Sequence, residues 1–338
     1  MSSETGKRKI INDPVHGFIA LPSKVIVDMV EHPFFQRLRR IKQLGLTHMV
    51  YPGALHTRFH HVLGAMHLMN EALDVLSAKG EIITPEEKQG ALLAILLHDI
   101  GHGPFSHALE NTLVTGVHHE QLSELFMDLL NKEFNGALSL GISIFKNQYP
   151  KKFLHQLVSS QLDMDRLDYL SRDSFYTGVS EGVISAERII KMLAVVNDEL
   201  VVEEKGVYSI EKFIVARRLM YWQVYLHKTV VSAEFLLVNI LKRAKELAKR
   251  GEVLFASPAL QRFLYHDYEW RHFEQDPTLL TDFAQLDDFD IMTSVKVWQS
   301  NSDKVLAELC HRMVNRQLFK IVIQKEPFQE NKLIQLKS

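Results

Sequence analysis

A short segment of the chain, residues 97–107, concentrates side chains that can bind a metal ion. It holds three histidines and an aspartate and begins directly after an apolar stretch. A buried imidazole beside a buried carboxylate is costly unless the two pair or bind a metal. His98 could be a satisfied core histidine and Asp99 a helix-end cap, because the same dipeptide recurs at residues 266–267. The Gly-Pro turn within the segment cannot be regular helix, which favours a metal site.

Two other stretches carry the further ligands that such a site needs. Upstream, His60 and His61 stand at the start of an amphipathic stretch. Downstream, four aspartates are spaced among leucines: Asp163, Asp165, Asp168 and Asp173. For any one of these carboxylates, a solvated helix face is the simpler explanation. Two imidazoles and two carboxylates would make a nitrogen and oxygen site suited to manganese, iron, magnesium or zinc, and the spacing does not choose among these metals.

The elements that position these groups are expected to be helices. Apolar residues recur at helical spacing in 25–30, 34–44, 63–76, 86–97, 120–131, 153–171, 186–195, 210–231 and 232–249. Glycines that follow such stretches predict helix ends at Gly45, Gly80, Gly136 and Gly251. The run Thr84-Pro85-Glu86-Glu87 predicts a helix start with proline at the first helical position.

A few segments predict strands within this all-α pattern. Residues 200–202 and 207–209 predict a short hairpin, and residues 319–323 are β-branched enough to form a strand. No repeat, low-complexity tract or linker divides the chain. We therefore expect an all-α fold with minor β pieces. Its main domain would span residues 1–250, with a core at about 50–175, and a C-terminal helical extension with a short strand would span 251–338.

Composition excludes several classes of protein. The 338 residues are 46% apolar and 24% charged, which is typical of a globular protein with a sizeable core. The net charge of −2 disfavours nucleic-acid binding, although local basic runs leave it open. The single cysteine, Cys310, excludes an internal disulfide and a multi-thiolate zinc site, and it favours a cytoplasmic location. No apolar stretch approaches the roughly 20 residues that cross a bilayer, so we expect no membrane partner.

Six motifs, in one order along the chain, give the sequence a family resemblance. The order His, His-Asp, Asp resembles the HD superfamily of metal-dependent phosphohydrolases. From about Lys9 to about Lys228 the motifs look more narrowly like those of the deoxynucleoside triphosphate triphosphohydrolases (dNTPases), which include dGTPases. They are NDPVHGFIAL, FFQRLRRIKQLG, YPGALHTRFHHVLG, LLHDIGHGPFSH, HHEQ and DMDRLDYLSRD. This resemblance implies the HD-domain helical fold.

The resemblance also implies a metal site and a catalytic cluster. Matched position by position, the metal ligands are His61, His98, Asp99 and Asp165, and the divalent ion would be manganese, magnesium, iron, zinc or nickel. His60 stands where the family often has an acidic residue and is not expected to be a ligand. Phosphate contact or proton transfer falls to His102, His107, Glu110 and His119, with Glu110 as the carboxylate partner of the catalytic histidine. Each of these histidines could also be a polar helix-end residue.

The same resemblance implies which residues bind substrate. Three arginines match triphosphate positions, where a planar guanidinium can take two phosphate oxygens: Arg58, Arg166 and Arg217. Two residues match positions that meet the deoxyribose: Tyr169 and Asp173. Three more match sugar and base contacts: Gln43, Leu44 and Tyr225. Leu226 replaces a family glutamine, which leaves the base preference open.

A regulatory site is implied near the N-terminus. In tetrameric members of the family, a guanine-nucleotide activator such as GTP or dGTP binds between subunits. The matching residues are Lys9, Ile10, Asp13, Glu31, Gln36 and Arg39. Basic residues in this region could equally be a solvated helix face. The resemblance therefore implies a homo-oligomer, either a dimer or a tetramer, with allosteric activation.

The function implied by the resemblance is hydrolysis of a dNTP to a deoxynucleoside and tripolyphosphate. A divalent ion lowers the pKa of a bound water and polarises a phosphoryl oxygen, which suits attack at the α-phosphorus. One alternative is an HD phosphohydrolase that acts on another phosphoester, such as a nucleoside monophosphate, a cyclic dinucleotide or an alarmone. Another is a non-catalytic nucleotide-sensing scaffold, which the intact set of ligand residues disfavours.

Overall fold

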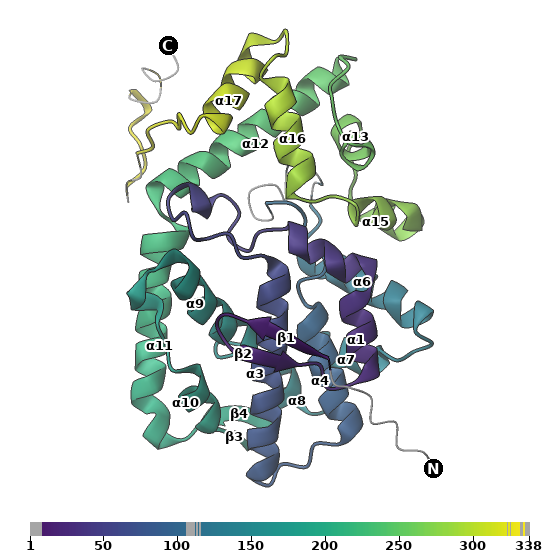
Figure 1. The fold of residues 1–338 in the computed structure, drawn as a ribbon, viewed down its shortest axis with the longest axis vertical. Helices are drawn as coiled ribbons and strands as arrows, with labels where there is room; N and C mark the ends of the chain where they lie inside the picture. Colours follow the sequence, from purple (N-terminus) through teal and green to yellow (C-terminus); the bar gives the residue numbers. More distant parts are fainter. Residues whose placement is uncertain are drawn as a thin grey trace.

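The fold is predominantly helical (Figure 1). The computed structural model describes residues 9–105, 112, 114, 116–322, 324, 326–331 and 334. Within this part of the chain the strands form two antiparallel two-stranded sheets, β1–β2 and β3–β4. The strands are β1 (Ile10–Asp13), β2 (Gly17–Ala20), β3 (Leu193–Val196) and β4 (Glu199–Val202). The expected all-α fold with minor β pieces is confirmed.

The helices fall into two sets along the chain. The first set is α1 (Lys24–Glu31), α2 (Pro33–Gln36), α3 (Arg58–Ala78), α4 (Pro85–Leu97), α6 (His119–Glu133), α7 (Ser139–Phe145), α8 (Lys152–Val158) and α9 (Met164–Thr177). The second set is α10 (Ala186–Lys191), α11 (Val207–Met220), α12 (Lys228–Lys249), α13 (Pro258–Tyr265), α14 (Trp270–Gln275), α15 (Pro277–Phe283), α16 (Asp288–Trp298) and α17 (Lys304–Val314). Helix α3 packs against both α4 and α9, so the segments with the predicted metal ligands are neighbours in space.

Local sequence signals explain where α4 begins and what it does. The Thr84 side chain accepts a hydrogen bond from the Glu87 backbone N–H, the Glu87 carboxylate accepts from the Thr84 N–H, and Pro85 occupies the first helical position. This reciprocal cap satisfies backbone donors that the first turn leaves free. Residues 90–97 are all buried, so the helix delivers the His-Asp pair at its end into the protein interior.

The helix predicted over residues 153–171 is instead two helices, α8 and α9. The break falls at residues 159–163, where Asp163 accepts hydrogen bonds from the Ser160 and Arg166 backbone N–H groups. An aspartate at this position caps a new helix more favourably than it continues an old one. The break therefore sets Asp165 in the first turn of α9 rather than in the middle of a long helix.

The predicted hairpin is right about the strand at residues 200–202 and wrong about its partner. Residues 200–202 lie in β4, which pairs with β3, whereas residues 207–209 begin α11. The turn is Asn197-Asp198, and both residues have positive φ, 52° and 65°. Two such residues form the tight turn that matches the twist of antiparallel strands. The strand predicted at residues 319–323 is also wrong for 319–322, which have no regular secondary structure; residue 323 lies outside the described residues.

The C-terminal helices gather at one end of the molecule. Figure 1 shows α13, α15, α16 and α17 around the far end of α12, away from the β3–β4 hairpin. The buried apolar side chains form one continuous core that includes residues on both sides of position 250. The division into residues 1–250 and 251–338 remains a prediction. Among the described residues, no single helix is long and apolar enough to cross a membrane, and only the bent pair Glu204–Tyr225 and Lys228–Lys249 reaches that length and composition.

Candidate functional site

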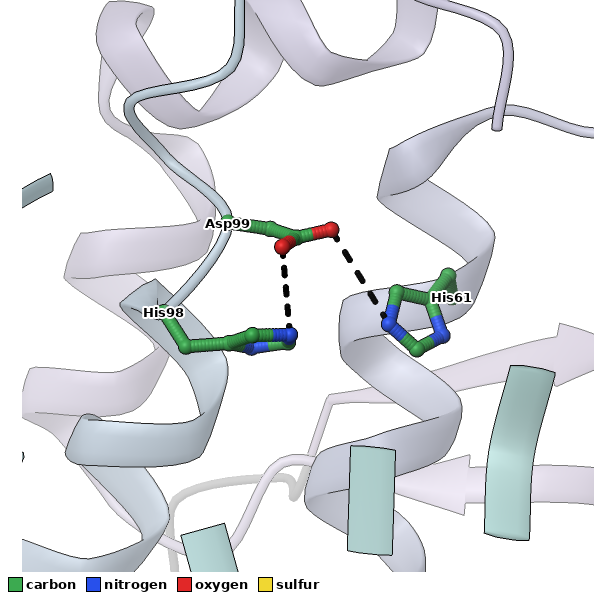
Figure 2. Close-up of side chains that lie close together, drawn as sticks. All are labelled: His61, His98 and Asp99. Carbon is green, nitrogen blue, oxygen red and sulfur yellow. Dashed lines mark ion pairs between the residues drawn. The ribbon is translucent and has the colours of Figure 1, made fainter. Parts of the chain in front are cut away.

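Three helices bring the predicted metal ligands together. His61 lies in the first turns of α3, His98 and Asp99 follow the last residue of α4, and Asp165 lies in the first turn of α9. One ligand atom from each of His61, His98 and Asp99 lies within 4.8 Å of the others. Figure 2 shows the Asp99 carboxylate facing both imidazole rings. Its oxygens lie 3.2 Å from His98 Nε2 and 3.9 Å from His61 Nε2.

Asp165 closes this group from the side of α9. Its Oδ1 atom lies 2.9 Å from His61 Nε2 and 3.6 Å from His98 Nε2. Metal–ligand distances are about 2.1 Å, so ligand atoms around one ion lie roughly 3 to 4 Å apart. The two nitrogens and the carboxylate oxygens therefore have the spacing of ligands around a single cation.

The two imidazole rings are oriented so that Nε2 is available to a metal. His61 Nδ1 lies 2.8 Å from Asp168 Oδ2, and His98 Nδ1 lies 2.6 Å from the Ile95 carbonyl oxygen. Each ring can therefore donate its Nδ1 proton and leave a lone pair on Nε2. Both Nε2 atoms are buried and have no hydrogen-bond partner of acceptable geometry. A buried nitrogen without a partner is expensive, so these residues fit a divalent metal ion.

A buried ionic network fixes His61 from behind. Asp168 accepts hydrogen bonds from Arg172, at 2.8 and 2.9 Å, and its other contacts are His61 and His16 Nε2, the latter at 2.6 Å. Arg172 also donates to Asp13 at 2.8 Å. A side chain at Gly64 would put its Cβ only 2.0 Å from Asp168 Oδ1, so the glycine permits this close approach to α3. Asp13 ends β1 and His16 lies in the turn between β1 and β2, so the β1–β2 hairpin supports the metal site.

The charges at the site call for a cation. Burial lowers the pKa of His61, but the carboxylates of Asp165 and Asp168 outweigh it and raise that pKa to about 10. Burial also lowers the pKa of His98, but the neighbouring carboxylates of Asp99 and Asp165 outweigh this effect, so that the pKa of His98 is raised as well. The pKa of Asp99 is held well below its ordinary value, because nearby His98 and Arg58 overcome the cost of burial. Without a metal, protons on the histidines balance the carboxylates, and a divalent ion can take their place.

Two predicted proton-transfer residues lie beside the metal ligands. The rings of His102 and His119 stack with centroids 3.8 Å apart, and His102 Nε2 lies 3.2 Å from Asp99 Oδ1. Burial and the adjacent Arg58 hold the pKa of His102 well below its ordinary value, so its ring is neutral at physiological pH. A neutral imidazole can accept a proton or donate one through its N–H. His107 and Glu110 lie outside the described residues.

A glycine allows the stacked histidines to meet. A Cβ atom on Gly101 would lie 2.3 Å from the His119 carbonyl oxygen and 2.4 Å from the Ser123 backbone nitrogen. The Ser123 hydroxyl accepts a hydrogen bond from Gly101 N–H and donates one to the His98 carbonyl oxygen. Helix α6 therefore packs directly on the loop that follows the His-Asp pair.

Two of the three predicted phosphate-binding arginines line the same cavity as His98, Asp99 and Asp165. Arg58 is buried and donates to Asp99 Oδ2 at 2.5 Å, while its Nε has no partner. Arg166 pairs with Asp163, and its Nε is likewise buried without a partner. Both keep donors for an anion. Arg217 does not line the cavity; it donates to Gln161 and lies near the cavity residue Tyr221.

The predicted sugar and base residues line the same cavity. The Asp173 carboxylate accepts a hydrogen bond from the Tyr225 hydroxyl at 2.7 Å, and its other oxygen lies 2.7 Å from His56 Nε2. Tyr169 packs edge-on against Tyr225 with ring centroids 6.3 Å apart. Gln43 also lines the cavity, and its buried Oε1 has no partner.

The cavity has a volume of about 960 Å³, which suits a nucleotide-sized ligand. A π-helical turn, Tyr221–Tyr225, joins α11 to α12 and brings two tyrosines to the cavity wall. The sequence reasoning missed Glu234 of α12, a cavity carboxylate with no hydrogen bond or ion pair among the described residues. Burial raises the pKa of its carboxyl to about 7. The sequence signal that could have pointed to Glu234 is a single glutamate among the apolar residues of an amphipathic helix.

His60 and the predicted activator residues lie away from the cavity. His60 Nδ1 accepts from the Thr57 backbone N–H and so caps α3, in line with its exclusion as a ligand. Four activator residues form pairs near the surface: Lys9 with Glu31, and Gln36 with Arg39. Ile10 is exposed in β1. The Asp13 carboxylate is buried and pairs with Arg172, and the assignment of these six residues to an activator site stays a prediction.

Fold, ligand geometry and sequence define the class of protein. The HD domain family matches residues 58–173, and the HD associated region matches residues 184–253. The chain belongs to the HD-domain phosphohydrolase superfamily.

The chain is similar over much of its length to several known proteins. It is 37% identical to the uncharacterized protein YwfO of Bacillus subtilis, over 95% of this chain and 73% of that protein. It is 32% identical to the deoxynucleoside triphosphate triphosphohydrolase SAMHD1 homolog of Dictyostelium discoideum, over 73% of this chain but only 51% of that protein. A crystal structure of a phosphohydrolase from Bacteroides thetaiotaomicron superposes with a TM-score of 0.95 at 60% identity, covering 97% of this chain and 83% of that one.

Proposed function

We propose that the protein is a metal-dependent dNTP triphosphohydrolase, which cleaves a dNTP to a deoxynucleoside and tripolyphosphate. The observation that carries the proposal is one cavity lined by three of the four candidate metal ligands, His98, Asp99 and Asp165. The same cavity has two arginines whose buried Nε atoms have no partner, and a tyrosine-lined end formed by Tyr169, Tyr221 and Tyr225. A relative that is named as a dNTPase supports the same substrate class. A divalent metal bound at His61, His98, Asp99 and Asp165 would activate water and polarise a phosphoryl oxygen.

The residues of the chain divide the remaining work. Arg58 and Arg166 would each bind phosphate oxygens through guanidinium donors that the protein leaves unpaired. The stacked His102 and His119 would hold or move a proton next to the reacting phosphate, with His119 as donor to the departing 5′-oxygen of the nucleoside.

The tyrosine-lined end would bind the nucleoside. Tyr169 would pack against the sugar at C2′, which disfavours a ribonucleotide. Asp173 would accept from the 3′-hydroxyl, because a carboxylate that already has two partners retains further lone pairs. Gln43, Leu44 and Tyr225 would surround the base.

We propose further that the protein works in the cytoplasm as a homo-oligomer with a GTP or dGTP activator. The paired surface residues Lys9, Glu31, Gln36 and Arg39 would contribute to the activator site. Exposed apolar side chains on α11 and the π-helical turn support an interface, since Tyr208 is 84% and Trp222 64% exposed.

The test uses the purified full-length protein with each dNTP and NTP. Reactions contain manganese or magnesium, with and without GTP, and the products are resolved by ion-exchange chromatography. Deoxynucleoside plus tripolyphosphate is the expected result, and a GTP requirement would support the activator site. The variants His61→Ala and Asp165→Ala should abolish turnover, and full activity in both would refute the metal assignment. His266→Ala is the matched control, because His266-Asp267 repeats the dipeptide on an exposed surface.

Other outcomes point to the alternatives. If no triphosphate is hydrolysed but a nucleoside monophosphate, cyclic dinucleotide or alarmone is, the protein is an HD phosphohydrolase of different substrate class. Nucleotide binding without hydrolysis of any phosphoester would instead favour a sensing scaffold.

A further inference from the structure

The C-terminal region reaches the active-site cavity through one buried carboxylate. Asp288 is the first residue of α16 and only 2% exposed. It lies outside both segments that match the HD families, which end at residue 253. Its two oxygens accept hydrogen bonds from two backbone N–H groups, Lys42 to Oδ2 and Phe105 to Oδ1, each at 3.0 Å. The Lys42 ammonium lies 3.5 Å from the same carboxylate.

The two backbone groups belong to different segments of the chain, which lie next to each other at the cavity: the Lys42 ammonium lies 5.7 Å from the centre of the Phe105 ring. Lys42 directly precedes Gln43 and Leu44, and its segment pairs with the start of α3, where Arg58 N–H donates to the Ile41 carbonyl oxygen. Phe105 follows His102 in the loop after the His-Asp pair. Both Lys42 and Phe105 line the cavity. Asp288 therefore joins the segment of the nucleoside-binding residues to the loop of the proton-transfer histidine.

The Phe105 backbone needs such support. Its φ is +47°, a left-handed conformation that a bulky residue rarely adopts and that costs free energy unless its surroundings hold it. The bond from Phe105 N–H to Asp288 is one such restraint, and the buried Phe105 side chain is another. A carboxylate is the fitting acceptor here, because it can serve two N–H donors at once.

A second contact places the same end of α16 against the same loop. Arg37 is fully buried and donates to the Leu286 carbonyl oxygen at 3.2 Å and to the Ile100 carbonyl oxygen at 2.7 Å. It therefore bridges the residues just before α16 and the residue just after Asp99. This contact fixes the distance between the C-terminal region and the His-Asp loop independently of Asp288.

We propose that Asp288 is a positioning residue, which holds the Lys42 and Phe105 backbones together and so fixes how the nucleoside-binding segment and the proton-transfer loop lie relative to one another at the cavity. The C-terminal region is then part of the catalytic unit and not an appendage to it. The reaction readout below rests on the proposed dNTPase function, whereas the exchange readout does not.

Hydrogen–deuterium exchange of the full-length protein tests the proposal without any substrate. Asp288→Asn leaves one acceptor oxygen for two donors, so the segments 41–45 and 101–105 should both exchange roughly ten-fold faster or more. Asp288→Glu keeps both oxygens and should restore protection in part. Asp287→Asn is the matched control: Asp287 caps the same helix end and pairs with Arg40, so its loss should affect the start of α16 but neither of the two segments.

Steady-state kinetics with a dNTP that the protein hydrolyses then distinguish a positioning role of Asp288 from a general effect on stability. Asp288→Asn should raise KM and lower kcat, while manganese affinity stays within about two-fold of wild type, because no proposed metal ligand contacts Asp288. The proposal is overturned if neither segment changes in Asp288→Asn, or if Asp287→Asn changes both segments equally. If Asp288→Asn does not fold, amide exchange of the wild-type protein still tests the proposal, because fast exchange of the Lys42 and Phe105 amides would refute it. If the wild type hydrolyses no dNTP, the proposed function fails and the exchange result stands by itself.

Discussion

Replacing Glu234 with glutamine should stabilise the protein at alkaline pH and have little effect near pH 5. Glu234 lines the cavity, and among the described residues no cation or hydrogen-bond donor contacts its carboxylate. Burial raises the pKa of this carboxyl from 4.5 to about 7. In the unfolded chain the group ionises near its ordinary value, so ionisation costs more in the folded protein than in the unfolded one.

The size of the effect follows from this difference in pKa. A carboxyl with a raised pKa in the folded state contributes stability that is present below the unfolded value and is lost as pH rises through the folded value. The upper limit of the loss is about 3 kcal/mol. Because the side chain borders a cavity that water can enter, we expect about 1 to 2 kcal/mol. Glutamine cannot ionise, so the variant avoids this penalty.

The assay is urea unfolding of wild type and Glu234→Gln, followed by tryptophan fluorescence, from pH 5 to pH 8.5 in a metal chelator. The free energy of unfolding of the variant relative to wild type should rise with pH and level off above about pH 7.5. Glu211→Gln, at an exposed position of α11, should show no such trend. A difference that does not depend on pH, or a wild type that is the more stable at pH 8.5, would refute the reasoning.

Three further predictions concern the metal site. Manganese at a hundred-fold excess over its Kd should stabilise the wild type by about 2.7 kcal/mol, measured by urea unfolding. The variant His61→Ala should not be stabilised in this way. Equal stabilisation of both proteins would mean that the metal binds elsewhere. Asp168→Asn should weaken manganese binding about 10- to 100-fold in calorimetry, because Asp168 orients His61, whereas Asp74→Asn on the exposed face of α3 should not. Gly64→Ala should lower the free energy of unfolding by about 1 to 3 kcal/mol, since the new Cβ would lie 2.0 Å from Asp168 Oδ1. An unchanged free energy of unfolding in urea would mean that the buried network can shift.

Much of the site could be predicted because its key residues lie in short, recognisable segments. The His-Asp pair follows an apolar helix, and the cap of that helix at Thr84 is also a local signal. These patterns depend on residues only a few positions apart. The four metal ligands came from matching such segments in order, and the structure brings all four together.

The supporting contacts could not be predicted, because they join residues far apart in the chain. His16 contacts Asp168 across 152 positions, and Asp288 reaches Lys42 and Phe105 across 246 and 183. None of these three pairings leaves a periodic trace in the sequence, since each depends on how helices pack. The error at residues 207–209 is different in kind: Asn197-Asp198 was a readable turn signal, and the hydrophobic pattern of residues 200–202 was assigned to the wrong partner.

The continuous core described above restricts how this protein can exchange parts with its relatives. Apolar residues of α13, α15, α16 and α17 share one core with those of the HD segment, and Arg37 and Asp288 join the two across the loop after Asp99. A chimera joined near residue 250 would have to inherit both sides of these contacts from the same parent. Recombination at this point should therefore yield well-folded hybrids only between parents that match in the residues around Lys42, Phe105 and the start of α16.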